Sequence, residues 1–181
     1  GAPNLVIGKI LLALGPAGNS RLSRQGLAAT TRFGYAGGTM GLLLNLQNIH
    51  LTFGGQPTLE GASLMLAEGE RMCLVGRNGS GKSTLLKIAA GLLAADEGDI
   101  WLQPGTTLRY LPQEPDFSGY ATVAEYVAAG LGPTDDPHRG SSLLNALGLT
   151  GEENTQTLSG GESRRAALSR VMAPAPDILL F

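Results

Sequence analysis

Cysteine is nearly absent from this sequence, and no apolar run in it suits a membrane span. The one thiol, Cys73, cannot form an internal disulfide, and such usage is typical of a reducing cytosol. The apolar stretch at 5–14 is interrupted by Lys9 and is shorter than the roughly 20 residues that a span requires. The formal net charge of −2 argues against broad nucleic-acid binding through bulk charge, although local basic patches are compatible with it. A hydrophobic content of 43% fits one globular domain.

Acidic residues are missing from the first 39 positions, which contain four basic ones. A secretory signal would carry its positive charge before the apolar run, whereas Lys9 lies inside it. An acid-free segment with arginines is also compatible with an organellar transit peptide. Because this segment is rich in Gly, Ala, Ser and Thr, we expect 1–39 to be a poorly structured leader or upstream extension, with Met40 as the true start.

A glycine-rich octapeptide is the strongest signal in the sequence. It matches the phosphate-binding P-loop pattern G-x-x-x-x-G-K-[ST] and consists of Gly76, Arg77, Asn78, Gly79, Ser80, Gly81, Lys82 and Ser83. An apolar run precedes it, and a helical pattern that begins at Thr84 follows it. We add Thr84 to the predicted phosphate-binding residues. Glycines let backbone N–H groups turn toward an anion at a helix N-terminus. We predict a nucleoside triphosphate site where Lys82 reaches the β- and γ-phosphates and Ser83 ligates Mg²⁺.

A second motif, Leu-Ser-Gly-Gly-Glu at 158–162, precedes a segment whose apolar residues recur at helical spacing. Ser159 stands at the predicted N-cap, and Glu162 three residues later completes a capping box. On local structure alone, the motif is a well-started helix.

Together and in this order, the two motifs resemble those of the ABC ATPase family, whose signature is LSGGQ or LSGGE. The resemblance implies an α/β P-loop NTPase fold with an antiparallel β subdomain and a small α-helical subdomain, and it implies ATP and Mg²⁺ as ligands. In the family, the signature closes over the γ-phosphate held by a second ATPase module, in the same chain or in a dimer. Ser159, Gly160, Gly161 and Glu162 are thereby assigned to nucleotide binding.

Two further positions match family motifs. Phe53 lies where the family has an aromatic residue that stacks on adenine, although a phenylalanine in a β-rich stretch is also a common core residue. Gln113 matches the Q-loop glutamine, which in the family coordinates Mg²⁺ and the attacking water. Taken alone, a glutamine between two prolines is a polar loop residue. The resemblance makes Gln113 the candidate catalytic and metal-binding side chain, together with Ser83 as metal ligand.

The sequence departs from the family pattern at its end. The segment 177–181, an Asp and four apolar residues, resembles the strand that leads into Walker B, whose Asp-Glu pair would come next. The chain stops at Phe181, and neither His50 nor His138 matches the downstream H-loop histidine. We expect a domain that is incomplete at the C-terminus, that comes from a longer reading frame, and that does not hydrolyse ATP alone.

The expected organisation is a leader at 1–39 and a partial ABC ATP-binding domain at 40–181, with a helical subdomain at about 116–172. Strands are predicted at 43–51, 63–66, 71–75, 99–102 and 107–111, and helices at 82–90, 122–131, 142–147 and 163–172. Cys73 is expected to be a buried thiol in the P-loop strand, and Trp101 a packing residue.

The type of ABC protein is less defined. Lys82 and Ser159 are only 77 positions apart. This compact spacing, the Leu-Pro-Gln-Glu-Pro segment at 111–115 and the opening Leu-Asn-Leu-Gln-Asn-Ile at 44–49 together resemble the first module of ABC-F proteins. Those are soluble tandem ATPases whose characterised members act on ribosomes. We therefore expect a cytoplasmic ABC-F-type ATPase, with the ribosome as a candidate partner. The alternative is the motor subunit of an ABC transporter, with transmembrane subunits as partners. A linker and a second P-loop downstream would favour ABC-F.

Overall fold

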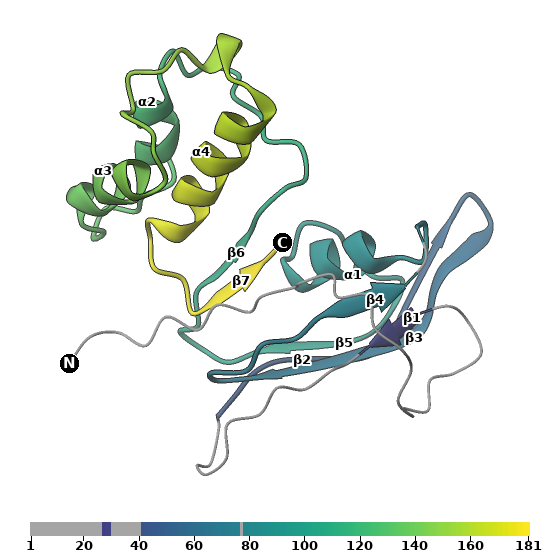
Figure 1. Cartoon of the computed structure of the whole chain (residues 1–181). Helices are drawn as coiled ribbons and strands as arrows, with labels where there is room; N and C mark the ends of the chain where they lie inside the picture. The colour runs from purple at the N-terminus through teal and green to yellow at the C-terminus, as the bar shows by residue number, and fades with distance from the viewer. Residues whose placement is uncertain (1–26, 30–40, 77) are drawn as a thin grey trace.

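The computed structural model describes residues 27–29, 41–76 and 78–181 (Figure 1). Nearly all of the expected leader at 1–39 lies outside this range. Its described part, Leu27–Ala29, forms strand β1, which pairs antiparallel with β4 (Leu74–Gly76). For these three residues the expectation of an unstructured leader is wrong, because their backbone pairs with the strand that enters the P-loop.

An antiparallel sheet forms one layer of the molecule. Its strands are β2 (Leu42–Phe53), β3 (Gln56–Ala67) and β5 (Glu97–Leu102), in the order β3-β2-β5. Gly54 and Gly55 join β2 to β3 with φ angles of 57° and 82°. Two consecutive left-handed residues are what a type I′ hairpin turn requires. The predicted antiparallel β subdomain is confirmed, although β3 starts directly after the turn, seven residues earlier than expected.

A second part of the molecule contains β4, helix α1 (Lys82–Ala89) and a parallel pair, β6 (Leu108–Tyr110) and β7 (Ile178–Leu180). The mixed antiparallel and parallel strands with helices confirm the α/β class. The side chain of Asp177 sets where β7 meets β6, because one of its carboxylate oxygens accepts from Thr107 N at 2.7 Å and from Thr107 Oγ1 at 2.8 Å.

The remaining helices form a separate group, which Figure 1 shows beyond β6 and β7, away from the antiparallel sheet. The group consists of α2 (Val123–Ala128), α3 (Pro137–Ala146), the 3₁₀ turn η1 (Thr155–Thr157) and α4 (Gly160–Met172). Its core packs Val123, Val127, Leu144 and Ala167 together. These helices all fall within the range predicted for the helical subdomain.

Strand β7 lies at the boundary of two hydrophobic cores. Ile178 and Leu180 belong to the core between the antiparallel sheet and α1, whereas Leu179 belongs to the core of the helical group. Successive strand side chains point to opposite faces, so a three-residue strand serves both cores. The two parts of the molecule are thus joined through β7 and its partner β6.

Several predicted boundaries differ from the structure. The P-loop strand begins at Leu74, so Cys73 precedes it and is half-exposed instead of buried. Helix α3 begins at Pro137, five residues before the predicted start, because the Asp136 side chain accepts a bond from His138 N at 2.9 Å and proline suits a first helical position. Helix α2 ends at Ala128, three residues early. Trp101 is 44% exposed on β5 and is no core residue.

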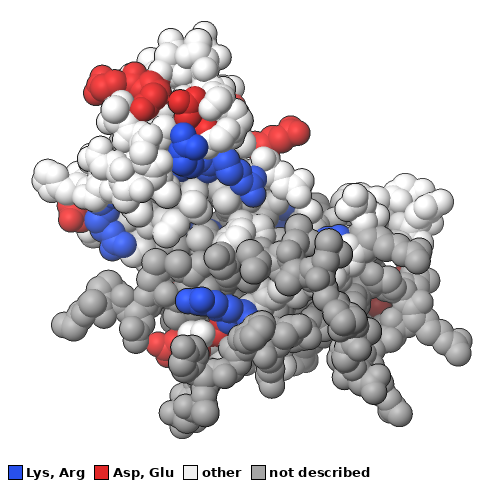
Figure 2. All heavy atoms as spheres, viewed as in Figure 1, with Lys and Arg blue, Asp and Glu red and all other residues white. Residues whose placement is uncertain are grey.

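Charge is distributed unevenly over the face in Figure 2. Acidic side chains gather near the top of the helical group, and basic side chains lie lower, toward the sheet. Among the described residues of this face, no broad surface of one sign is visible. Within the described ranges, no helix is both long and apolar enough to cross a membrane.

Candidate functional site

The glycines of the P-loop are required by its backbone. Gly79 and Gly81 have φ angles of 81° and 83°, in the left-handed region that other residues resist. At Gly81 there is also no space, since an added Cβ would lie 2.7 Å from Leu59 Cδ2 and 2.9 Å from the Thr58 carbonyl oxygen. The first residues of β3 therefore hold this end of the loop.

Among the described residues, no side chain caps the N-terminus of α1. Its N-cap is Gly81, which offers no side-chain acceptor, and its first turn carries no acidic residue. The Lys82 ammonium lies over the loop, donating to the Gly76 carbonyl oxygen at 2.8 Å and lying 3.4 Å from Ser80 Oγ. A helix N-terminus beside a cation favours an anion. Asn78 is exposed on the loop, and Arg77 lies outside the described residues.

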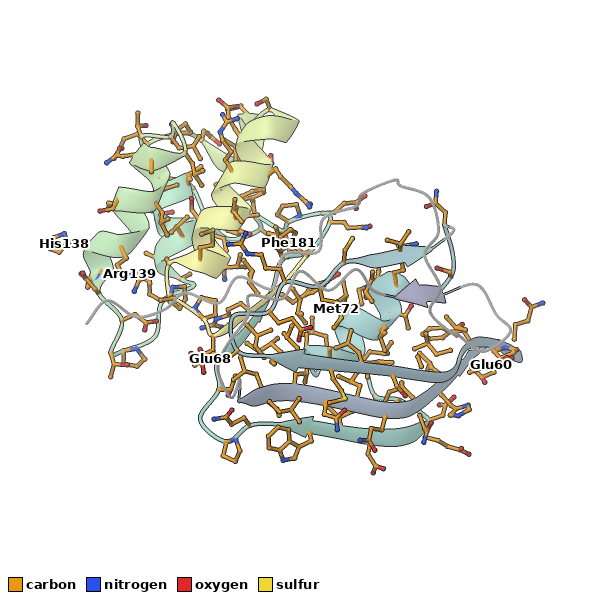
Figure 3. All side chains as sticks on the ribbon, turned by 60° about the horizontal axis from the view of Figure 1, so that its bottom comes forward. Glu60, Glu68, Met72, His138, Arg139 and Phe181 are labelled. Atoms are coloured by element: carbon orange, nitrogen blue, oxygen red, sulfur yellow. The ribbon has the colours of Figure 1, made fainter. Side chains whose placement is uncertain are left out.

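The P-loop and the Q-loop meet in one pocket of about 170 Å³. Lys82 and Ser83 line it from α1, and Gln113 lines it from the segment after β6. Phe181 also lines it, and Figure 3 shows this residue between the helical group and the sheet. The other lining residues are Leu74, Leu86, Tyr110, Leu111 and Arg164. A cation, a hydroxyl and an amide in one small pocket suit a phosphate chain with its Mg²⁺.

Phe53 does not line this pocket. It belongs to β2, which pairs with β3, the strand whose first residues lie against Gly81. It is the last residue of β2 and is 52% exposed, which argues against the alternative of a core residue. Two positions earlier, Leu51 pairs with Leu59, the residue that packs against Gly81. Phe53 therefore lies two positions along β2 from the strand pair that reaches Gly81.

The signature residues form the capping box that their spacing predicts. Ser159 Oγ accepts from Glu162 N at 3.3 Å and donates to Glu162 Oε2 at 2.7 Å, while Ser159 N donates to the same oxygen at 2.8 Å. These bonds favour the ionised carboxylate and lower the pKa of Glu162, the serine hydroxyl being the largest cause. Ser159 is exposed and lies outside the pocket that Lys82 lines.

The two signature glycines are not required by the structure of this chain. A Cβ added at Gly160 would meet no atom within 4 Å, and one at Gly161 would meet only the end of the Arg165 side chain, at 3.3 Å. Neither residue has a positive φ. The described residues would therefore accept side chains at both positions.

Arg164, on α4, belongs to the site although sequence reasoning did not single it out. Its Nη1 donates to the carbonyl oxygens of Gln113 at 3.2 Å and Pro112 at 3.4 Å, and its side chain lines the pocket. Its charge also acts on Tyr110: burial raises the pKa of that phenol, and Arg164 offsets part of the rise. Only folding brings Arg164 to residues about 50 positions earlier, so no local pattern could have revealed it.

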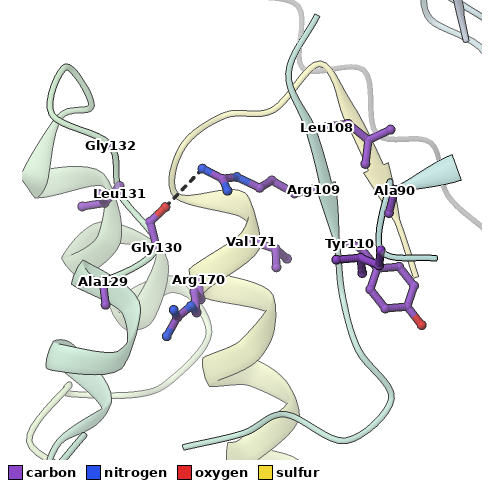
Figure 4. Close-up of a pocket in the computed structure, with 11 residues that line it drawn as sticks. Ala90, Leu108, Arg109, Tyr110, Ala129, Gly130, Leu131, Gly132, Arg170 and Val171 are labelled. Atoms are coloured by element: carbon purple, nitrogen blue, oxygen red, sulfur yellow. Dashed lines mark hydrogen bonds between the residues drawn. The ribbon is translucent and has the colours of Figure 1, made fainter. Parts of the chain in front are cut away.

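A second pocket, of about 460 Å³, lies where β6 faces the helical group (Figure 4). Arg109 and Arg170 contribute its cationic side chains, and Arg109 Nη2 donates to the Gly130 carbonyl oxygen at 3.4 Å. None of the sequence-predicted site residues lines it. His50 and His138 are absent from both pockets, and Figure 3 places His138 on the outer side of the helical group.

Comparison with known proteins bears on this arrangement. The family model described as "ABC transporter" matches residues 59–181. "ATP-binding protein Uup" of Caulobacter vibrioides is 45% identical over 140 residues, covering 77% of this chain and 22% of the relative. "Sulfate/thiosulfate import ATP-binding protein CysA 2" of Chromobacterium violaceum is 41% identical over 144 residues, covering 71% and 39%. The chain thus spans well under half the length of these relatives.

A solved structure shares the fold. The nucleotide-free ATP-binding cassette of an ABC transporter superposes with a TM-score of 0.61 at 24% identity, covering 76% of this chain and 67% of the cassette. At this identity, the likeness concerns the fold alone. The family model and the solved structure thus both indicate the fold of an ATP-binding cassette.

Proposed function

This chain belongs to the ABC transporter family of ATP-binding domains, and on that premise we propose that it binds Mg-ATP at the P-loop formed by 76–84. The loop N–H groups and the N-terminus of α1 hold the phosphates, and Lys82 balances their charge. Ser83 and Gln113 ligate Mg²⁺, which would shield the charge between the β- and γ-phosphates. Phe53 stacks on the adenine.

The meeting of Lys82, Ser83 and Gln113 in one pocket is the observation that carries this proposal. The P-loop alone would support phosphate binding of many kinds. The glutamine reaches the pocket from a separate segment, 30 positions after Ser83 in the sequence. An amide at that place supplies the oxygen that a second Mg²⁺ contact needs.

For the whole protein, we propose ATP hydrolysis between two modules. Ser159, Gly160, Gly161 and Glu162 then contact the γ-phosphate of a nucleotide held by the other module, either in the same chain or in a dimer. Two observations support this. Ser159 lies outside the pocket of its own P-loop. No contact with a described residue requires glycine at position 160, and at 161 an added Cβ would meet only the end of the Arg165 side chain. The group that orients the water for attack on the γ-phosphate is proposed to be part of the active site of the whole protein.

We further propose that the whole protein is a cytoplasmic ABC-F-type tandem ATPase that acts on the ribosome. The compact interval between P-loop and signature and the similarity to "ATP-binding protein Uup" support it. The second candidate, an ABC transporter motor subunit bound to transmembrane partners, is supported by the similarity to an import ATP-binding protein. Reading the gene downstream distinguishes them, since a linker and a second P-loop favour ABC-F.

Calorimetry with Mg-ATP tests the nucleotide site. Lys82→Ala removes the ammonium that balances the phosphate charge, so we expect no measurable binding. Lys87→Ala is the matched control, because Lys87 is an exposed lysine in the last turn of the same helix, and it should bind like the parent. Equal affinity of the parent and Lys82→Ala would refute the P-loop assignment.

A further inference from the structure

Two arginines bridge the helical group and the β6 segment by donating to backbone carbonyls. Arg109, on β6, donates to Gly130 O, in the segment after α2. Arg164, on α4, donates to Pro112 O and Gln113 O, in the Q-loop. The two bridges are alike in chemistry, but only the second joins a predicted nucleotide contact to the helix that the signature begins.

The Arg164 bridge connects the proposed nucleotide pocket of this chain to the helix that carries the signature motif. The Gln113 side chain lines the pocket of Lys82 and Ser83, and the carbonyl oxygen of the same residue is held by Arg164. Arg164 is five residues after the N-cap Ser159, which is about 7.5 Å along a helix. The Arg164 bonds therefore form a direct physical connection between the Q-loop backbone and the helix that begins at the signature.

The packing of α4 into the helical group rests on residues other than Arg164. Arg164 is exposed, and α4 is anchored by other residues, Ala166, Ala167 and Val171, which are buried in the helical core. One guanidinium nitrogen donates to two consecutive carbonyl oxygens and so ties α4 to the Q-loop backbone at this point. Charge-assisted bonds from a planar guanidinium are directional, whereas lysine supplies a point charge.

We propose that Arg164 is a positioning residue that couples the Q-loop to the signature motif. Mg-ATP at this chain's own P-loop then sets where Ser159 is presented to the second module. The inference rests on the proposed function, since it requires a nucleotide that Gln113 contacts. Its role is distinct from that of Gln113, because Arg164 acts through the backbone of the Q-loop.

Hydrogen–deuterium exchange of this chain, with and without saturating Mg-ATP, tests the coupling. In the parent, nucleotide should slow exchange both in the Q-loop, at 111–117, and at the start of α4, at 159–163. In Arg164→Met, the slowing at 111–117 should persist, while the effect at 159–163 should fall roughly fivefold or more. Arg164→Lys should show an intermediate effect, because it keeps the charge and loses the planar fork.

Arg109→Met is the matched control, since it removes the other arginine bridge and leaves the Q-loop contact intact. It should keep the parent's nucleotide effect at 159–163. Undiminished coupling in Arg164→Met would overturn the proposal, and so would an equal loss at both segments, which would show a structural role. Should Arg164→Met fail to fold, unchanged coupling in Arg164→Lys would count against it. A parent that does not bind Mg-ATP by calorimetry would overturn the proposed function itself.

Discussion

Helices α1 and α4 both begin behind glycine-rich segments, but their first turns are completed in different ways. At α1 the N-cap is Gly81, in the left-handed conformation, and no side chain caps the helix. At α4 the N-cap is Ser159, in an extended conformation, and Glu162 completes a capping box. Among the residues that the structure describes, no side chain closes the start of α1, whereas the start of α4 is closed by its own residues.

Under the proposed function, this difference separates a phosphate site at which no bond within the helix cap has to break from one at which such a bond has to be replaced. The open N-terminus of α1, with Lys82 over the loop, gains most when a phosphate arrives. The signature hydroxyl already donates to Glu162 Oε2, so under the proposed function a phosphate from a second module would have to replace that bond. The two glycines also differ. Position 81 needs glycine because its φ angle is positive and a Cβ would collide with β3, whereas neither reason applies at position 160.

The largest effect that we expect comes from replacing Gly81 with alanine, and the same change at Gly160 is the comparison. Gly81→Ala should abolish Mg-ATP binding and lower the melting temperature, because the left-handed conformation alone costs about 1–2 kcal/mol and the Cβ would collide with Thr58 and Leu59. Gly160→Ala should change stability by less than about 0.5 kcal/mol and leave binding unaltered. Calorimetry and thermal unfolding measure both, and equal effects of the two variants would remove the contrast.

A bulky residue at the signature should act on turnover. In the whole protein, Ser159→Arg should leave ATP binding at the chain's own P-loop nearly intact, because Ser159 is outside that pocket. It should lower kcat more than it raises KM, since the serine contact and the closed arrangement of two modules are lost. Steady-state kinetics measure the split. Turnover at the parent rate would reduce the motif to a helix cap.

A smaller loss of affinity is expected from Phe53→Ala. By analogy with base–aromatic stacking, it should weaken ATP binding by about 1–3 kcal/mol. A triphosphate without a base serves as the control ligand, and its affinity should not change. If both ligands lost affinity equally in calorimetry, Phe53 would not be the adenine platform.

The smallest effect concerns the pH dependence of the α4 cap. Because the folded-state pKa of Glu162 is lowered, its carboxylate contributes stability above the unfolded pKa near 4.5 and loses that contribution as the pH falls through the lowered folded value. Glu162→Gln keeps a capping-box side chain but cannot titrate. Its melting temperature should therefore fall less steeply below pH 5 than the parent's. Identical slopes in thermal unfolding would contradict the capping role of the charge.

The elements that were predicted correctly depend on near neighbours in the chain. Both capping boxes need only a residue and its partner three positions later, and α1 follows directly from the P-loop pattern. The start of α3 was predicted too late, although Asp136 and Pro137 are a local start signal. Strand β1 could not be predicted, because its partner β4 is almost 50 positions away and its own residues carry no strand pattern.

The sequence by itself determined the phosphate-binding loop, the signature cap and the family, because these depend on residue type at short, fixed spacing. Only the tertiary structure decided that Gln113 shares a pocket with Lys82, that β7 serves two cores, and that Arg164 holds the Q-loop backbone. Every residue has a backbone carbonyl, so an arginine that binds one requires no particular residue type at the position it contacts. Such contacts exist only once packing has brought distant segments together.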